Sequence, residues 1–427
     1  MASESVRLAV RLPITFGRRR VALLTSAGLV LVAAAIYLLD TDATNRLAAW
    51  VHPEGDTPLP PLVPASESAA LRALAQQGVR RIPLTRLPAL PERTRDLAAR
   101  GARSHLVVPL REGDRLIGVL LGGDRRTPAP LSPDEEAELA SAGRLAAAIV
   151  RRAERNAEAA HQRIRDRVAH VLAHPELLEP VFQPIVAVRG GEIAGYEALA
   201  RFRLEPVQPP DAWFAQAALV GLGPALEALA LRRAHELVQA ARLPPGTFLS
   251  VNVSPANLAH PAVTDVLGTC ELERCVLELT EAEPVADYAA LRQAMAPLLA
   301  RGARFAVDDA GAGYASMRHV TEIRPAFVKL DARLVRGLTD DRARQALVRA
   351  LFGFAAEIGA TGVAEGVEEA ADLALLRRTR LPVLAQGYAL ARPGPPWPSL
   401  AQASRTTARH AAAQGREASV ADQTAAW

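Results

Sequence analysis

Acidic side chains close several short apolar runs in the C-terminal half of this 427-residue sequence. The clearest case is the run 305–307, which ends in the adjacent carboxylates Asp308 and Asp309. The same arrangement repeats and supplies five carboxylates and two side-chain amides, namely Glu197, Glu278, Asp308, Asp309, Glu365, Asn252 and Gln386. Gathered in one place, this much negative charge requires cations, and hard oxygen ligands favour Mg²⁺ or Mn²⁺ over zinc. Two such ions about 3.5–4 Å apart suit an in-line displacement at phosphorus.

One lysine accompanies these acids. The chain has 50 basic residues, of which Lys329 is the single lysine and all the others are arginines. This bias predicts that Lys329 occupies a position where a compact ammonium is needed and a planar guanidinium does not fit. Chance survival of one lysine is the alternative. Beside a pair of cations, the ammonium would orient an attacking water or neutralise developing charge.

The elements that precede these side chains must position them. From residue 177 onwards, short apolar runs such as 275–279 alternate with stretches of helical periodicity such as 287–302. Strands that alternate with helices over 177–400 predict a (β/α)8 barrel of the TIM type. The carboxyl ends of the strands of such a barrel meet on one face, so the polar side chains are expected to converge there. Scattered surface carboxylates are the opposing interpretation, and five acids at successive strand ends count against it.

Eight motifs in one order carry a resemblance to a known family. Between residues 177 and 395 they read FQPIV, YEALARF, NVSP, ELTE, VDDAGAGYAS, VKLD, AEGVE and AQGY. This part of the chain closely resembles the EAL-domain family of cyclic di-GMP phosphodiesterases. The resemblance implies a modified (β/α)8 barrel, frequent homodimerisation, and cleavage of one phosphodiester of cyclic di-GMP. The implied product is linear 5'-pGpG, and the implied cofactor is Mg²⁺ or Mn²⁺.

The resemblance also implies roles for individual residues. It implies a two-metal site with the ligands Glu197, Asn252, Glu278, Asp308, Asp309 and Glu365. The candidate catalytic residues are Lys329, which would contact the nucleophilic water, and the carboxylates Glu365 and Glu197. Substrate would contact Gln183, Arg201 and Gln386, with Arg201 on a phosphate. The loop after the aspartates would be supported by Glu281, Gly311 and Gly313.

That loop departs from the family pattern. The family usually has Phe-Gly-Thr-Gly-Tyr-Ser-Ser, whereas residues 310–316 of this chain read AGAGYAS. Both glycines and the tyrosine are retained, so the turn is still expected, but a phenylalanine and two hydroxyls are replaced by alanine. Two hypotheses therefore stand: an active phosphodiesterase regulated through its N-terminal part, and a catalytically silent receptor for cyclic di-GMP. The complete set of ligands favours the active enzyme.

Residues 21–39 allow two interpretations. They are uncharged, follow three arginines, and are close to the length of a transmembrane helix. Such a span would place the barrel outside the cytoplasm. The polar turn and second apolar run at 40–51 favour a β-hairpin instead, and a second hairpin pattern follows at 104–123.

A helix-capping signal at 132–135 follows the second hairpin. This order of elements resembles a GAF sensory domain over 21–152. We therefore expect a cytoplasmic protein, with anchoring in the inner membrane through residues 21–39 as the alternative.

The composition, the two cysteines and the order of the segments give the remaining expectations. The net charge of +4 and the 4% of aromatic residues give no sign of a nucleic-acid-binding surface. Cys270 and Cys275 lack a second Cys/His pair for zinc, so two reduced thiols are expected. The expected segments are an N-terminal arm (1–20), a GAF-like domain (21–152), a connecting helix (153–176), the EAL domain (177–400) and a flexible tail (401–427).

Overall fold

The chain divides into two compact units, Met1–Gln162 and Arg163–Trp427. The computed structural model describes residues 31–39, 45–51, 62–63, 65–86, 98–99, 101–279, 285, 287–311, 314–379 and 381–400. The N-terminal arm and the C-terminal tail expected from the sequence therefore lie outside the described residues. The boundary between the units falls inside one continuous helix, α4 (Pro133–Ala173), whose second half was expected as the connecting helix.

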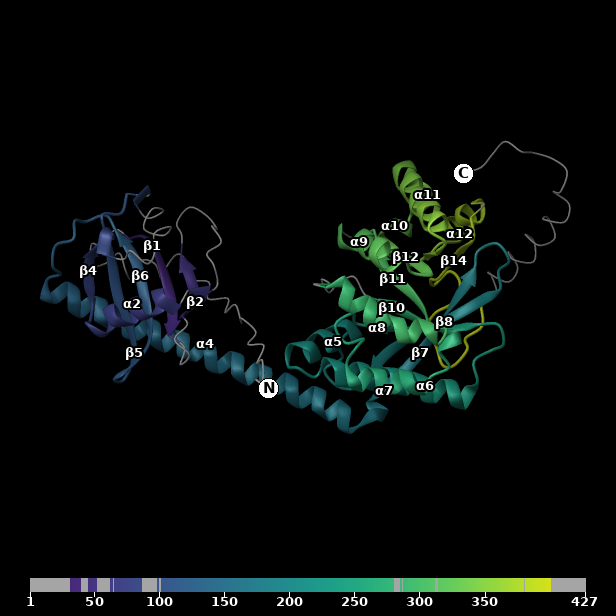
Figure 1. Ribbon diagram of the computed structural model, residues 1–427, viewed down its shortest axis with the longest axis horizontal. Coiled ribbons are helices and arrows are strands. Elements are labelled where there is room, and N and C mark those ends of the chain that lie inside the picture. Colours follow the sequence, from purple (N-terminus) through teal and green to yellow (C-terminus); the bar gives the residue numbers. More distant parts are fainter. Residues whose placement is uncertain are drawn as a thin grey trace. The chain divides into compact units, whose positions relative to one another are not determined.

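The N-terminal unit contains an antiparallel sheet in the order β3-β2-β1-β6-β5-β4 (Figure 1). Its elements are β1 (Leu31–Leu39), β2 (Asn45–Val51), β3 (Leu62–Val63), α2 (Ala65–Gln76), β4 (Arg80–Pro83), a 3-10 turn (Leu84–Arg86), β5 (Ser104–Glu112) and β6 (Arg115–Asp124). Both predicted hairpins are confirmed, because β1 pairs with β2 and β5 pairs with β6.

The described half of the apolar run 21–39 is strand β1 rather than a helix. This strand pairs with β2 on one side and with β6 on the other, so it lies inside the sheet. Residues 21–30 lie outside the described part of the chain. Among the described helices, none combines the length and the apolar character needed to cross a bilayer.

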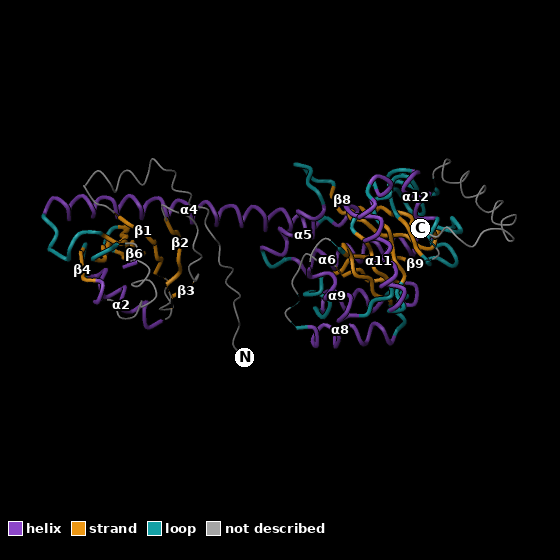
Figure 2. The backbone as a smooth tube through the Cα atoms, turned by 90° about the horizontal axis from the view of Figure 1, so that it is seen from above, coloured by secondary structure: helices purple, strands orange, loops and turns teal. Residues whose placement is uncertain are grey.

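Helices cover both faces of this sheet, because apolar side chains alternate along its strands. Leu106 and Val108 of β5 pack with Leu139 and Val150 of α4, whereas Val107 packs against Leu71 of α2. Figure 2 shows α4 and α2 on opposite sides of the strands.

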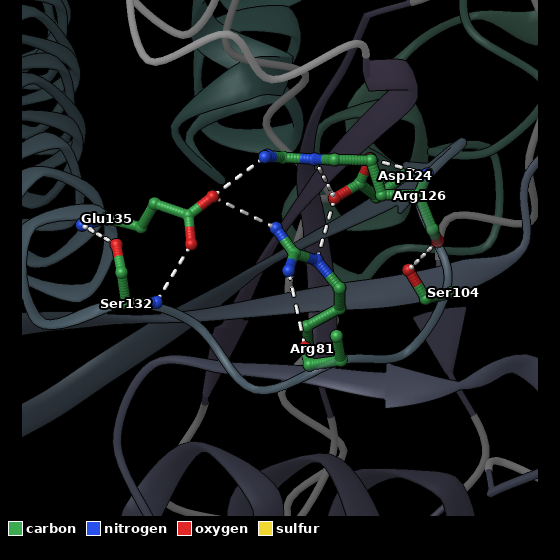
Figure 3. A network of polar contacts seen from close by, with 7 residues as sticks. Arg81, Ser104, Asp124, Arg126, Ser132 and Glu135 are labelled. Atoms are coloured by element: carbon green, nitrogen blue, oxygen red, sulfur yellow. Dashed lines mark hydrogen bonds and ion pairs between the residues drawn. The ribbon is translucent and has the colours of Figure 1, made fainter.

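The start of α4 is fixed by a capping box and by ion pairs (Figure 3). Ser132 Oγ accepts from the Glu135 amide at 3.2 Å, and Glu135 Oε2 accepts from the Ser132 amide at 2.8 Å, which confirms the predicted cap. Arg81 Nε lies 2.9 Å from Oδ2 of the fully buried Asp124, and Arg126 Nη1 lies 2.7 Å from Glu135 Oε1. These contacts tie β4 and the end of β6 to the first turn of the helix.

Burial of His105 predicts that the N-terminal unit loses stability in mild acid. Its side chain on β5 is fully buried, and this burial lowers its pKa from 6.5 to about 4. As the pH falls, His105 therefore binds a proton in the unfolded chain before it does so in the folded chain. Its effect on the free energy of unfolding is absent above about pH 6.5, and this free energy decreases as the pH falls from there towards 4. We expect opening of β5 and β6 to cost about 2 kcal/mol less at pH 5 than at pH 7.

Hydrogen exchange of the 104–124 segment in the full chain measures this opening at each pH. A His105→Gln variant, which does not titrate in this range, should show a smaller change between the two pH values. An equal change in both proteins would contradict the assignment to His105.

The C-terminal unit contains a closed barrel of eight strands among the described residues, in the order β10-β11-β12-β13-β14-β7-β8-β9. The strands are β7 (Leu178–Ala187), β8 (Ile193–Phe202), β9 (Phe248–Val253), β10 (Cys275–Leu279), β11 (Arg304–Ala310), β12 (Phe327–Leu330), β13 (Thr361–Ala364) and β14 (Val383–Ala385). Strand β7 runs antiparallel to both of its neighbours, and the other pairs are parallel. The predicted modified (β/α)8 barrel is thus confirmed.

Helices surround this barrel (Figure 2). They are α5 (Pro210–Leu219), α6 (Gly223–Ala241), α7 (Pro261–Thr269), α8 (Tyr288–Ala300), α9 (Tyr314–Ile323), α10 (Ala332–Val335), α11 (Arg342–Glu357) and α12 (Ala370–Arg377), with 3-10 turns at Pro175–Leu177, Leu272–Arg274 and Leu338–Asp340. The main core lies between strands and helices, where outward residues such as Leu277 and Val307 meet Leu291 and Phe352. Cys270 and Cys275 are free thiols, as expected.

Candidate active site

The inside of the barrel is built in layers, because alternate residues of a strand point to the same side. An apolar floor is formed by Ile185, Phe248, Val276, Ala306, Phe327 and Val363. The residues two positions further towards the open end are Gln183, Ser250, Glu278, Asp308, Lys329 and Glu365. The floor therefore ends where a polar layer begins, and five of the six residues of this layer, all except Ser250, are ones that the sequence predicted.

Glu197 enters this layer from β8. It pairs with Gln183 of β7 and with Ser250 of β9. It lies in the middle of β8 rather than at its end, since this strand continues to Phe202 alongside the antiparallel β7. Gly195, two residues earlier, leaves space for the floor residue Phe248, whose ring lies 2.6 Å from where a Cβ would be.

Lys329 is the centre of the polar layer. Its side chain is 2% exposed, and its Nζ lies 2.6 Å from Glu278 Oε2, 2.7 Å from Glu365 Oε1, 3.1 Å from Asp308 Oδ1 and 3.7 Å from Glu197 Oε1. Four carboxylates thus surround one compact ammonium. A guanidinium would need more room than this closed site offers, which accords with the prediction from composition.

The electrostatics of the cluster are those of buried acids that share one cation. Burial opposes the charge of Lys329, yet the surrounding carboxylates, Asp308 first, raise its pKa well above 10.5. Burial, together with neighbouring negative charge, raises the pKa of Glu278 well above its usual value and that of Glu365 to about 8. Burial also acts to raise the pKa of Glu197, but Lys329 and hydrogen-bond donors lower it overall. Four carboxylates thus supply more negative charge than Lys329 alone balances, and the raised pKa values of Glu278 and Glu365 reflect this in part.

Glu197 is held by side-chain amides. Gln386 Nε2 donates to its Oε2 at 2.6 Å, and Asn252 Nδ2 donates to its Oε1 at 3.0 Å. Gln386 Nε2 also donates to Gln183 Oε1 at 3.0 Å, and Gln183 Nε2 donates to the Ala391 carbonyl at 3.1 Å. These contacts unite four of the predicted residues in one network.

Ser250 belongs to the cluster, although the sequence analysis did not select it. Its Oγ donates to Glu278 Oε1 at 2.5 Å, and it is 1% exposed. The signal for it was the alternation of β9, because Ser250 lies two residues before Asn252 and two after Phe248.

Asp308, Asp309 and Glu365 form the group best suited to hold a cation. One side-chain oxygen from each lies within 4.8 Å of the others. Asp309 has φ +54°, a left-handed conformation that is unfavourable for a residue with a side chain, and its amide donates to Asp308 Oδ1 at 3.0 Å. Backbone strain of this kind persists at functional sites. The oxygen donors and the excess of negative charge fit a hard divalent cation.

The remaining predicted residues are placed as follows. Arg201 lies on the same face of β8 as Glu197, four residues further on, and donates to the carbonyl of Ala200 at 2.8 Å. Gly311 has φ +97°, and a Cβ there would lie 2.5 Å from Leu334 Cδ1, so this position requires glycine. Glu281 and Gly313 lie outside the described residues.

Comparison with known proteins agrees with this geometry. The model of the EAL-domain family, described as "EAL domain", matches residues 165–393, and a model described as "GAF domain" matches residues 22–152. The chain therefore belongs to the EAL-domain family, and both resemblances seen in the sequence are confirmed.

Two of the curated relatives each match about half of this chain. An uncharacterized signaling protein of Caulobacter vibrioides is 34% identical over 50% of this chain and 27% of its own length. The cyclic di-GMP phosphodiesterase NbdA of Pseudomonas aeruginosa is 31% identical over 51% of this chain and 29% of its own length. The chain thus spans less than a third of the length of each of these relatives.

A solved structure is also similar. A manganese/cyclic di-GMP complex of Klebsiella pneumoniae BlrP1 is 27% identical, with a TM-score of 0.46 over 51% of this chain and 56% of that chain.

Proposed function

We propose that this protein hydrolyses one phosphodiester bond of cyclic di-GMP to give linear 5'-pGpG, using Mg²⁺ or Mn²⁺. The observation that carries the proposal is the buried cluster in which four carboxylates surround Lys329 within 3.7 Å. Membership of the EAL-domain family and the name of the relative NbdA indicate the substrate.

Different residues of the cluster have different roles in this proposed reaction. The proposed metal ligands are Glu197, Asn252, Glu278, Asp308, Asp309 and Glu365. Bound cations supply Lewis acidity at the phosphate and a more acidic water. Lys329 donates a hydrogen bond to the attacking water and Glu365 accepts one, so the two residues orient it for in-line attack.

Substrate contacts are proposed for three residues at the edge of the cluster. Arg201 binds a phosphate, for which its fork of N–H donors is suited. Gln183 and Gln386, which are joined to each other and to Glu197 by hydrogen bonds, contact the substrate from β7 and from the end of β14.

The test is turnover of cyclic di-GMP by the purified full chain with Mg²⁺ or Mn²⁺ and with EDTA. Formation of pGpG that depends on the metal supports the enzyme. Cyclic di-GMP that binds to the protein but is not cleaved would overturn the proposed hydrolysis. That outcome would favour the silent receptor, with the altered loop 310–316 as its cause.

The excess of carboxylates predicts that Mn²⁺ stabilises the fold. A cation at one hundred times its dissociation constant adds about 2.7 kcal/mol to the free energy of unfolding, so Mn²⁺ should raise the melting temperature relative to EDTA. Asp308→Asn should remove most of that rise, whereas Asp211→Asn on the exposed face of α5 should retain it. Equal rises in both variants would place the cation elsewhere.

We also propose that the N-terminal unit regulates the barrel through α4. The same helix contributes Leu139 and Val150 to the core of the first unit and Val168 and Val171 to the core beside Phe202 of β8. Replacing 157–159, midway along the helix, with three glycines should change turnover without changing Mn²⁺ affinity. Unchanged turnover would contradict this coupling.

Two further proposals concern the cellular location and the oligomeric state of the protein. We propose a cytoplasmic homodimer, because the substrate is a cytosolic messenger and the family often dimerises. Cell fractionation tests the location, and light scattering of the purified full chain tests the dimer. Recovery in washed membranes, or a monomer at all concentrations, would contradict these proposals.

A further inference from the structure

A buried carboxylate outside the acidic cluster contacts the loop that follows Asn252. Glu227 lies on α6 and is 7% exposed. Its Oε2 accepts a hydrogen bond from the Ser254 amide at 3.2 Å and another from Asn257 Nδ2 at 3.0 Å. One carboxylate oxygen therefore holds the beginning and the middle of the turn that leaves β9.

This turn is short and tightly held. The Asn257 amide donates to the Ser254 carbonyl at 3.0 Å, the His260 amide donates to the Asn257 carbonyl at 2.8 Å, and Leu258 is fully buried. Between the turn and Asn252 lies only Val253, which is 1% exposed. Because this region is tightly packed, a displacement of Ser254 would also displace Asn252.

The position of Asn252 matters because only one of its side-chain atoms remains for a cation. Its Nδ2 donates to Glu197 Oε1 at 3.0 Å, which leaves Oδ1 as the acceptor. Ligating groups depend on their supporting contacts for orientation, and an error of about 0.5 Å in such a group already weakens a site.

We propose that Glu227 is a positioning residue that sets the Asn252 side chain for a divalent cation. It acts from the rigid helix α6, through the Ser254 amide, without touching the cation or the substrate. This inference rests on the proposed metal site. It adds a residue that the motifs do not include, because Glu227 precedes Asn252 by 25 positions and belongs to a helix.

Mn²⁺ binding to the full chain, followed by the electron paramagnetic resonance of the free ion, tests this role without requiring turnover. Glu227→Ala should raise the dissociation constant of Mn²⁺ by about 10–100-fold. Glu227→Gln keeps one acceptor oxygen in place and should recover most of that loss. Asn257→Ala, which removes only one donor, should weaken binding in the same direction and covers the case in which Glu227→Ala does not fold.

Asp372→Asn is the matched control. Asp372 is likewise a buried carboxylate that holds a loop, since it is fully buried and accepts from the backbone amides of Gly337 and Thr339 at 3.1 Å each. The loop that it holds carries none of the proposed ligands, so this variant should lose thermal stability but keep its Mn²⁺ affinity.

The outcomes separate this inference from the proposed function. Wild-type affinity in Glu227→Ala, or an equal loss in Asp372→Asn, would overturn the positioning role while leaving the metal site intact. No Mn²⁺ binding by the wild-type chain would overturn the proposed metal site itself, and the positioning role with it. Weakened binding in Glu227→Ala alone supports the positioning role, even if cyclic di-GMP is not cleaved.

Discussion

Replacing Lys329 with methionine is expected to lower the proposed cyclic di-GMP turnover by about 10²–10³-fold, which is the effect of removing one preorganised hydrogen-bond donor from an active site. The ammonium lies within 3.7 Å of four carboxylates, and it is the positively charged group of this described cluster that can donate a hydrogen bond to the attacking water. Steady-state kinetics at saturating Mn²⁺ measure the change.

The same substitution should also destabilise the fold. Breaking a buried ion pair by removing one partner costs about 3–5 kcal/mol, because Glu278 and its neighbours keep their charge or must take up protons. Urea unfolding in EDTA measures this loss, and Mn²⁺ should restore part of it by replacing the missing positive charge. A variant as stable as the wild type in EDTA would contradict the account of Lys329 as the cation that holds the cluster together.

Lys329→Arg is the matched control, because it keeps the charge and changes the shape. A side chain that is 2% exposed in the wild type leaves little space for the larger planar group. We expect this variant to lose turnover as well. Retention of most activity would show that charge alone matters at this position and that the single lysine of the sequence survived by chance.

The sequence was sufficient to predict which chemical groups meet, because the period of a strand and the convergence of strand ends are local rules. Glu278, Asp308, Lys329 and Glu365 each lie on a separate strand or just after it, two residues beyond a floor residue. The barrel then places them in one layer. Ser250 obeys the same rule and could have been selected by it.

Other features depend on contacts that no local pattern contains. The antiparallel pairing of β7 with β14 joins residues that are distant in sequence, such as Val186 and Ala385, whereas its pairing with β8 is that of a local hairpin. The left-handed backbone of Asp309 is imposed by the tertiary structure, since aspartate does not favour it in isolation. Glu227 reaches its loop across 27 residues. These are the features in which tertiary packing overrides local preference.

Replacing Glu197 with alanine is expected to lower the proposed turnover by about 10³-fold, because Glu197 is a proposed metal ligand and bound metal ions contribute several kcal/mol of charge stabilisation in the transition state. The carboxylate accepts hydrogen bonds from Asn252 and Gln386 and faces Lys329. Its loss therefore removes a proposed ligand and also frees the two amides that it orders. Formation of pGpG, measured beside cyclic di-GMP binding by calorimetry, checks the result.

Ser250→Ala provides the graded comparison for this prediction. Ser250 is outside the proposed ligand set and donates one hydrogen bond to the ligand Glu278, so its removal should cost about tenfold in turnover. If the site acts through metal ions, the decrease in turnover must be larger in Glu197→Ala than in Ser250→Ala. If Glu197→Ala cleaves cyclic di-GMP as fast as the wild type, the barrel binds its cations without this carboxylate, and the catalytic centre must be sought in the group of Asp308, Asp309 and Glu365 alone.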